Sequence, residues 1–174
     1  MKATNKLINP LIVGAALLAT SMCANAQTGV SFTNDSGTGY NIGYEMKSRT
    51  LETGISTNIV YNKPSGSGRS DYTTFFFGGY AGKRVTLTKD GIFSYGAMGS
   101  YGLYRSSKDA AVNSDTREPM VVGAYTGLAY VPSKSIELFT RLMPISYNRK
   151  NSNAVEIELF GEGAMGIKYF FSKK

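Results

Sequence analysis

The last part of the chain alternates between two kinds of side chain with a period of two. From Val155 to Phe171 the odd-numbered positions are apolar, aromatic or glycine, whereas the even-numbered positions carry all the charges, which are Glu156, Glu158, Glu162 and Lys168. A period of two places the two sets on opposite faces of one β-strand. The segment is therefore predicted to be a long strand with one apolar face and one charged face.

The same two-faced pattern recurs earlier in the chain. It is clear in residues 39–47, 51–62 and 136–144. It is diluted by glycine, alanine or clustered aromatic residues in 72–88, 92–105 and 120–131, and a short opening strand is expected at 28–33. Within 72–88, a register change near Gly78–Gly79 or Gly82 would suit a β-bulge. Agreement over separate segments indicates an all-β chain.

The connections between these runs differ in length. The short ones are 48–50, 89–91 and 132–135, and the longer, polar ones are 62–70, 106–117 and 147–153. This asymmetry is typical of an eight-stranded antiparallel up-and-down transmembrane β-barrel with short periplasmic turns and longer extracellular loops.

Two glycine patterns suggest nucleotide binding at first sight. Gly161 to Gly166 reads G-x-G-x-x-G, but that motif works at a strand-to-helix turn, and here the strand-like sequence IKYFF follows it. The stretch GGYAGKR lacks the P-loop spacing and has Arg84 where Ser or Thr must hold magnesium. Glycines inside a strand instead favour close approach of another backbone, or a bend of the kind a small barrel needs.

Residues 1–26 have the three-part layout of a secretory signal peptide, with a basic start, an apolar run and a closing Ala-Asn-Ala. The apolar run is too short to span a bilayer as a helix. Cleavage before Gln27 is predicted to leave one domain, residues 27–174. A lipid-anchored Cys23 is the alternative, which the preceding Thr-Ser-Met disfavours.

Composition excludes several kinds of chemistry. Histidine is absent, and the single cysteine lies in the predicted signal peptide. The commonest general base and metal ligand are therefore missing, and we expect no catalytic site, no metal and no cofactor. The net charge is +7, and losing Lys2 and Lys6 with no acid before Gln27 leaves 7 − 2 = +5. A basic exported protein favours anionic envelope surfaces over nucleic acid.

The signal-like start, the alternating strands and the ending GIKYFF together resemble the small eight-stranded outer-membrane β-barrels of the OmpA-transmembrane-domain and OmpX type. The C-terminal assembly signal of that family matches Gly166, Tyr169 and Phe171 here. The resemblance implies an outer-membrane location, contact with outer-membrane lipid and lipopolysaccharide, and recognition by the outer-membrane assembly machinery. It also implies a structural or surface role in adhesion or envelope protection, without identifying a host or surface ligand. Barrel enzymes of this size generally rely on histidine, so their activities are not implied.

The charged strand faces supply candidates for ion pairs inside the barrel. An eight-stranded barrel is just wide enough for side chains to fill it, and we expect Phe139 and Phe160 to help close it. The predicted lumen network comprises Glu45, Lys47, Glu52, Glu137, Arg141, Glu156, Glu158, Glu162 and Lys168. In the predicted loops, cationic contacts to anionic glycolipid are expected from Lys63, Arg69, Arg149 and Lys150.

Two other architectures fit the same alternation. One is a soluble periplasmic barrel of lipocalin type, with its apolar face turned inward around a small apolar ligand. The other is a narrow or gated channel. Aromatic residues near the expected strand ends favour a membrane barrel with two interfacial girdles; they are Tyr40, Tyr61, Tyr72 and Tyr147 on the loop side, and Phe93, Tyr130, Tyr169 and Phe171 on the turn side.

Overall fold

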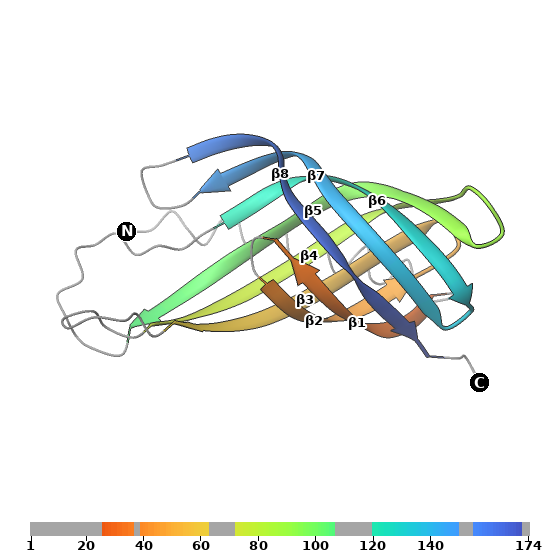
Figure 1. The fold of residues 1–174 in the computed structure, drawn as a ribbon, viewed down its shortest axis with the longest axis horizontal. Helices are drawn as coiled ribbons and strands as arrows, with labels where there is room; N and C mark the ends of the chain where they lie inside the picture. The colour runs from red at the N-terminus through yellow and green to blue at the C-terminus, as the bar shows by residue number, and fades with distance from the viewer. Residues whose placement is uncertain (1–25, 37–38, 63–71, 107–119, 150–154, 172–174) are drawn as a thin grey trace.

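The chain folds into one closed β-barrel (Figure 1). The computed structural model describes residues 26–36, 39–62, 72–106, 120–149 and 155–171. Each strand pairs antiparallel with its sequence neighbours, and the first pairs with the last. The strands are β1 (Gln27–Asp35), β2 (Gly39–Lys47), β3 (Leu51–Asn62), β4 (Tyr72–Thr86), β5 (Gly91–Ser106), β6 (Met120–Ser133), β7 (Ile136–Arg149) and β8 (Val155–Phe170). The predicted eight-stranded up-and-down barrel is confirmed.

Several predicted features lie outside the described residues. The signal peptide does so except for Ala26, and so do most of the predicted loop positions, including Lys63, Arg69 and Lys150. Within the part that the structure describes, no helix is long and apolar enough to cross a membrane.

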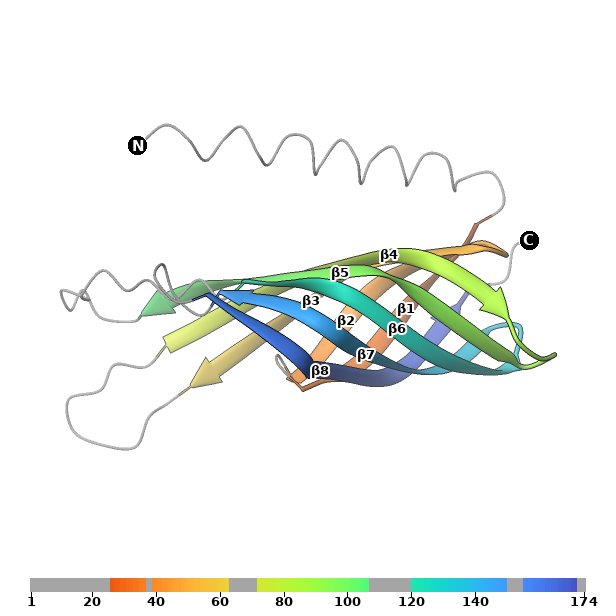
Figure 2. The same ribbon diagram turned by 90° about the horizontal axis from the view of Figure 1, so that it is seen from above.

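The strands differ in length, which makes the barrel wall uneven. β1 and β2 have 9 residues each, whereas β4 to β8 have 14 to 16. Figure 2 shows β3, β4 and β5 reaching further than β1 and β2 toward the end that carries the connections 36–38, 63–71, 107–119 and 150–154, called the loop end below. The opposite end, with the connections 48–50, 87–90 and 134–135, is called the turn end.

The ladders of the barrel are irregular at Pro144 in β7, and the β6–β7 ladder shifts register again between Tyr130 and Ser133. Proline cannot donate a ladder hydrogen bond, and a closed sheet leaves it no free edge, so it requires a bulge. The register shifts on both sides of it, between Ala124 and Thr126 in the β6–β7 ladder and between Met143 and Ile145 in the β7–β8 ladder. The bulge expected near Gly78–Gly79 or Gly82 is wrong, because the ladders on both sides of β4 are continuous. Glycine permits a bulge, but proline imposes one here.

The barrel is charged inside and apolar outside. Its buried polar side chains include Glu45, Glu137 and Lys168. Large apolar side chains such as Ile55 and Leu142 are more than half exposed on the outer face. An apolar exterior around a polar interior is the arrangement of a membrane barrel. The soluble barrel with an apolar cavity is therefore wrong, because the apolar faces of the strands point away from the lumen.

Aromatic side chains lie exposed near both ends of the outer face, as expected for two girdles. They are Tyr40, Tyr61 and Tyr147 toward the loop end, and Tyr130, Tyr169 and Phe171 toward the turn end. Phe93 is half-buried, and the side chain of Tyr72 lies outside the described part.

Candidate functional site

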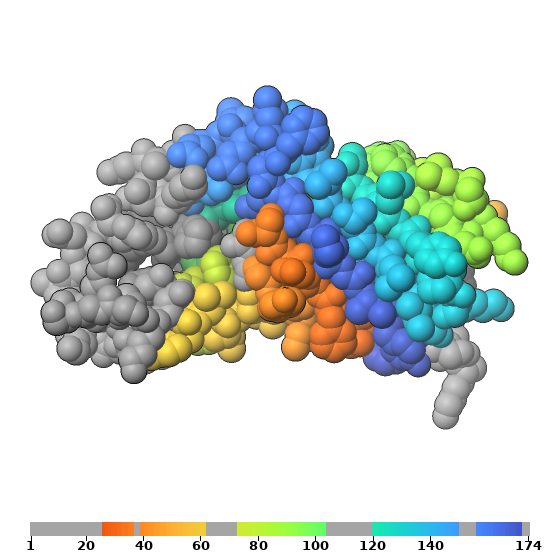
Figure 3. All heavy atoms as spheres, in the orientation of Figure 1, coloured from red at the N-terminus to blue at the C-terminus, as the bar shows by residue number. Residues whose placement is uncertain are grey.

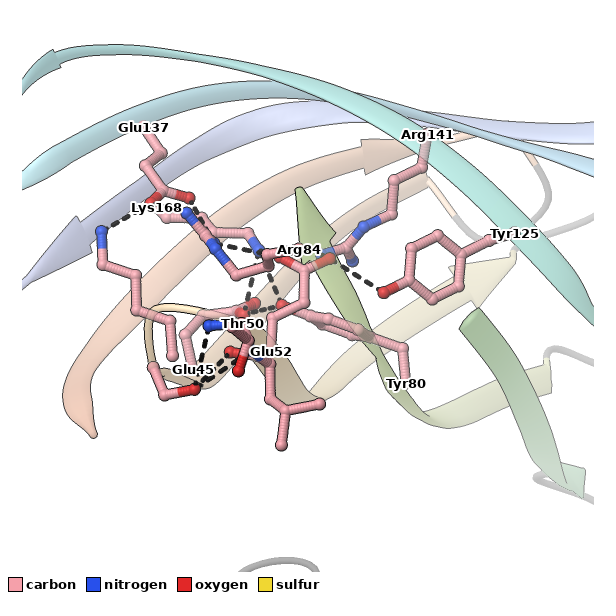
Figure 4. A network of polar contacts seen from close by, with 12 residues as sticks. Glu45, Thr50, Glu52, Tyr80, Arg84, Tyr125, Glu137, Arg141 and Lys168 are labelled. Atoms are coloured by element: carbon pink, nitrogen blue, oxygen red, sulfur yellow. Dashed lines mark hydrogen bonds and ion pairs between the residues drawn. The ribbon is translucent and has the colours of Figure 1, made fainter. Parts of the chain in front are cut away.

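A network of charged side chains fills the lumen nearer to its turn end (Figure 4). It contains four cations and three carboxylates from five strands: Lys47, Arg84, Arg141 and Lys168, with Glu45, Glu52 and Glu137. All seven are buried. Buried charges are tolerated only when they are paired and hydrogen-bonded. The packing of this barrel therefore depends on how the seven groups meet.

Two glutamates hold most of the cations. Glu137 accepts hydrogen bonds from Lys47 Nζ at 2.5 Å and from Arg84 Nη2 at 2.6 Å. Glu52 accepts one from Arg84 Nη1 at 3.2 Å. Arg84 thus bridges two carboxylates, which suits the fork geometry of a guanidinium.

Glu52 also faces two cations from the far wall of the barrel. Arg141 Nη2 lies 3.5 Å from its Oε1, and Lys168 Nζ lies 3.4 Å from its Oε2. Lys168 Nζ lies 3.4 Å from Glu45 Oε2 as well. These contacts join β2, β3, β7 and β8 across the lumen, so the network links strands that share no ladder.

Two tyrosines complete the network, and each reaches its glutamate across glycine. Tyr125 donates to Glu52 Oε1 at 2.8 Å. In the register, Glu52 faces Gly82, Gly82 faces Gly96, and Gly96 faces Tyr125. The two glycines therefore leave the lumen side of these strands open, and the tyrosine ring lies across them.

The second tyrosine repeats this arrangement. Tyr80 donates to Glu45 and accepts a hydrogen bond from Lys168 Nζ at 2.7 Å. Gly54 lies between Tyr80 and Glu45 in the register, and a Cβ there would overlap both side chains. Among the described residues, a tyrosine therefore reaches a glutamate twice, once across two glycines and once across one.

Aromatic rings also contact the cations directly. The Arg141 guanidinium carbon lies 3.5 Å from the centroid of the Tyr80 ring. Lys47 Nζ lies 3.6 Å from the centroid of Phe170, which is 1% exposed. Such contacts stabilise desolvated cations. Phe170 and Lys47 together help close the turn end of the lumen.

The structure brings together six of the nine residues predicted for the lumen network. Glu156, Glu158 and Glu162 lie elsewhere, toward the loop end of β8, where Glu156 is exposed and the other two are half-buried. Glu162 is six positions from Lys168, which at about 3.3 Å per residue is roughly 20 Å along the strand. Alternation predicted the correct face for them, but not their distance from the cations.

Of the two phenylalanines expected to fill the lumen, one does so. Phe139 is 7% exposed and packs with Arg141, whose guanidinium carbon lies 4.8 Å from its ring centroid. Phe160 is 75% exposed, so its predicted interior position is wrong. It lies opposite Pro144 in the irregular part of the β7–β8 ladder and has a φ of 55°. This left-handed backbone interrupts the alternation on which the prediction depended.

Three members of the network were not predicted from the sequence: Tyr80, Arg84 and Tyr125. Tyr80 and Arg84 are both at even-numbered positions of β4 and therefore share its inward face. The alternation that indicates this face is obscured by neighbouring aromatic residues and glycines. Tyr125 lies in a run rich in glycine and alanine, and only the strand register shows that it faces Glu52.

The predicted assembly residues lie on two faces of the wall, with Gly166 and Tyr169 in β8 and Phe171 directly after it. Gly166 faces inward beside Phe139, and a Cβ there would overlap the Phe32 carbonyl oxygen and lie 3.0 Å from the Phe139 ring. Tyr169 and Phe171 are exposed on the outer face, with ring centroids 5.9 Å apart. Close packing against Phe32 and Phe139 therefore requires glycine at position 166.

Arg149, predicted as a loop cation, is the last residue of β7. The strand continues past Pro144, so the loop begins later than expected. The predicted partners Lys63, Arg69 and Lys150 lie outside the described residues.

The lumen offers little free space. On the loop side of the network, a hollow of about 50 Å³ is lined by residues that include Tyr80, Arg141 and Glu162. The described residues contain no group of acidic side chains that could hold a metal ion. A packed, ion-paired interior is consistent with the size of an eight-stranded barrel.

Replacing Gly82 with valine is expected to lower the free energy of unfolding by about 3 kcal/mol, through overpacking and the loss of the Tyr125–Glu52 hydrogen bond. A Cβ at Gly82 would overlap Tyr125 Oη and lie 2.9 Å from Cζ. Gly79→Val in the same strand is the control, because its nearest contact is 3.4 Å. Urea titration in lipid vesicles, read by gel mobility with and without boiling, measures both. Equal effects of the two substitutions would contradict the role of Gly82.

A closed eight-stranded antiparallel barrel with an apolar exterior and a charged lumen is a transmembrane β-barrel. No protein-family model matches the chain, and comparison with curated protein sequences gives no match. Solved structures do match.

The Neisserial surface protein A is 16% identical, with 84% of this chain and 96% of that chain covered and a TM-score of 0.49. Ail, the attachment invasion locus protein of Yersinia pestis, is 15% identical, with 84% and 96% covered and a TM-score of 0.44. Ail has also been solved in complex with the heparin analogue sucrose octasulfate, and in that form it is 14% identical with a TM-score of 0.46. The eight-stranded barrel fold that the resemblance implied is confirmed by the strand topology of this chain itself.

Proposed function

We propose that this protein is an exported, non-enzymatic β-barrel of the outer membrane that has a structural or surface-interaction role through its loops. The observation that carries this proposal is the buried, ion-paired network of the lumen inside an apolar wall. A wall of this kind is stable in lipid, and a filled lumen leaves the loops as the surface available for recognition. Adhesion and envelope protection are the roles that suit such loops.

The absence of histidine and of a free thiol in residues 27–174 supports a non-enzymatic role. The buried glutamates are held by arginine and lysine, so they are unavailable as general bases.

The test is fractionation of cell envelopes, followed by gel electrophoresis of the outer-membrane fraction with and without boiling. A folded membrane barrel is expected in that fraction and changes its mobility on heating. Recovery in the soluble fraction with no heat shift would overturn the proposal.

A narrow or gated channel is the alternative for the same fold. Arg84, Glu52 and Glu137 occupy the lumen cross-section near the turn end, and this favours a closed barrel. We expect no steady conductance when the wild-type barrel is inserted into planar bilayers. A constant single-channel current that persists after removal of contaminating porins would favour the channel instead.

The cationic positions near the loop end are proposed to contact lipopolysaccharide phosphates. Substituting Lys63, Arg69, Arg149 and Lys150 together with serine is expected to weaken binding to lipopolysaccharide about tenfold, at roughly 0.4 kcal/mol for each charge removed. The control substitutes four exposed cations of the turn end in the same way, namely Arg49, Lys83, Lys89 and Lys134. Surface plasmon resonance on immobilised lipopolysaccharide measures both, and equal binding by the two variants would remove the support for this contact.

We also propose that Gly166, Tyr169 and Phe171 carry the signal that the outer-membrane assembly machinery recognises. The outward positions of Tyr169 and Phe171 support this role, since both rings are accessible on the barrel surface.

A further inference from the structure

A large hollow lies on the outer wall of the barrel. It measures about 930 Å³ and runs over β6, β7, β8, β1 and β2. These strands are consecutive neighbours in the barrel, and Figure 3 shows β6, β7, β8 and β1 on one face.

The strand register explains the shape of this groove. One row of residues crosses the five strands with its side chains turned inward and forms the floor: Ala129, Phe139, Gly166, Thr33 and Asn41. Two outward rows form the walls. The row on the turn side is Tyr130, Leu138, Ile167, Phe32 and Ile42, and the row on the loop side is Leu128, Thr140, Met165, Asn34 and Tyr40.

The dimensions and lining of the groove suit a hydrocarbon chain. Crossing five strands takes four interstrand spacings of about 4.8 Å, a length of roughly 19 Å. The turn-side wall consists entirely of large, exposed apolar side chains. A long, narrow and apolar channel of this kind, on a surface that faces lipid, is complementary to one extended acyl chain.

Polar side chains mark one end of the groove. Asn34 and Tyr40 face each other in the β1–β2 ladder, next to the connection 36–38 at the loop end. Both are exposed on the outer face, and Tyr40 is 80% exposed. An amide and a phenol can donate hydrogen bonds to the ester and amide carbonyls of a lipid, which an apolar wall cannot do. The lipid therefore belongs to the leaflet at the loop end.

We propose that this groove binds one acyl chain of lipid A, the acylated glycolipid of the leaflet at the loop end, with the chain's carbonyl group at Asn34 and Tyr40. This proposal rests on the outer-membrane location proposed above. It adds a defined lipid-binding site on the wall, distinct from the cationic contacts of the loops.

Two matched threonine variants test the site. Thr140 lies in the loop-side wall of the groove, and Thr57 is an exposed, outward threonine of β3 on another part of the wall. Wild type, Thr140→Trp and Thr57→Trp are folded into phosphatidylglycerol vesicles that contain lipid A. Each is then extracted into mild detergent, and the retained lipid is counted by native mass spectrometry.

We expect wild type and Thr57→Trp to retain one lipid A molecule, and Thr140→Trp to retain about tenfold less. The heat-dependent gel shift shows separately whether each variant is folded and inserted. Should Thr140→Trp not fold, Asn34→Leu provides the second variant, with the same expected loss.

Equal retention by the two threonine variants, or no retention by an inserted wild type, would overturn the groove as a binding site. Retention of phosphatidylglycerol in place of lipid A would overturn lipid A as the occupant. Failure of the wild type to insert at all would instead overturn the proposed function, and the gel shift distinguishes that result from the others.

Discussion

Replacing Glu52 with glutamine is expected to lower the free energy of unfolding of the barrel by about 3–5 kcal/mol, the cost of breaking a buried ion pair by removing one partner. Glu52 contacts Arg84, Arg141 and Lys168, all of them buried. Glutamine keeps the shape and still accepts the hydrogen bond of Tyr125, but it leaves four cations with two carboxylates. Uncompensated positive charge in a lumen without bulk water is costly.

Glu156→Gln is the matched control, because Glu156 lies exposed at the loop end of β8. Its effect is expected to stay under about 1 kcal/mol. Urea titration of both variants in lipid vesicles, followed by gel mobility, gives the comparison; the chain has no tryptophan for intrinsic fluorescence. Equal stabilities for the two variants would show that the lumen network does not hold the barrel together.

Replacing Ile55 with arginine is expected to destabilise the inserted barrel by about 2–4 kcal/mol, the cost of a cation on the lipid face near the bilayer midplane. Ile55 is 66% exposed and lies between Tyr44 and Gly79 on the outer wall. It is four residues from the turn end of β3, roughly 10 Å in height for a tilted strand. No carboxylate stands opposite it in the ladders to pair with the new charge.

Leu87→Arg is the control, because it distinguishes the effect of depth in the membrane from the effect of introducing arginine at any outward position. Leu87 is 59% exposed and follows β4 at the turn end, where a cation reaches the interface. Its cost there is expected to be about 0–1 kcal/mol. Unfolding midpoints in vesicles measure both variants. If Ile55→Arg stabilised the protein or made it soluble, the outer face would not be in contact with lipid.

Strand prediction succeeded where alternation is undiluted. β2 and β3 begin and end where the pattern does, at 39–47 and 51–62. β7 extends five residues further than expected, because Pro144 reads as the end of a strand in sequence. In the barrel, the neighbouring ladders shift register around this proline and the strand continues. Proline usually ends a strand, but pairing with β6 and β8 keeps β7 extended beyond Pro144.

The lumen network was predictable only in part, for a similar reason. The inward parity of Glu45, Glu52 and Lys168 follows from the local period. That Tyr125 reaches Glu52 depends on two glycines in two intervening strands. Gly82 and Gly96 lie between Tyr125 and Glu52 only when β3, β4, β5 and β6 are paired in this register.

The sequence by itself determined the class of fold, because a period of two is a property of each segment alone. It decides which side chains share a face, and repetition of the pattern decides how many strands there are. The tertiary structure decided which charges meet. Glu52 and Lys168 are 116 positions apart, and they come within 3.4 Å only when β1 pairs with β8 and closes the barrel. Closure and register are set by all eight strands together, and no single segment encodes either of them.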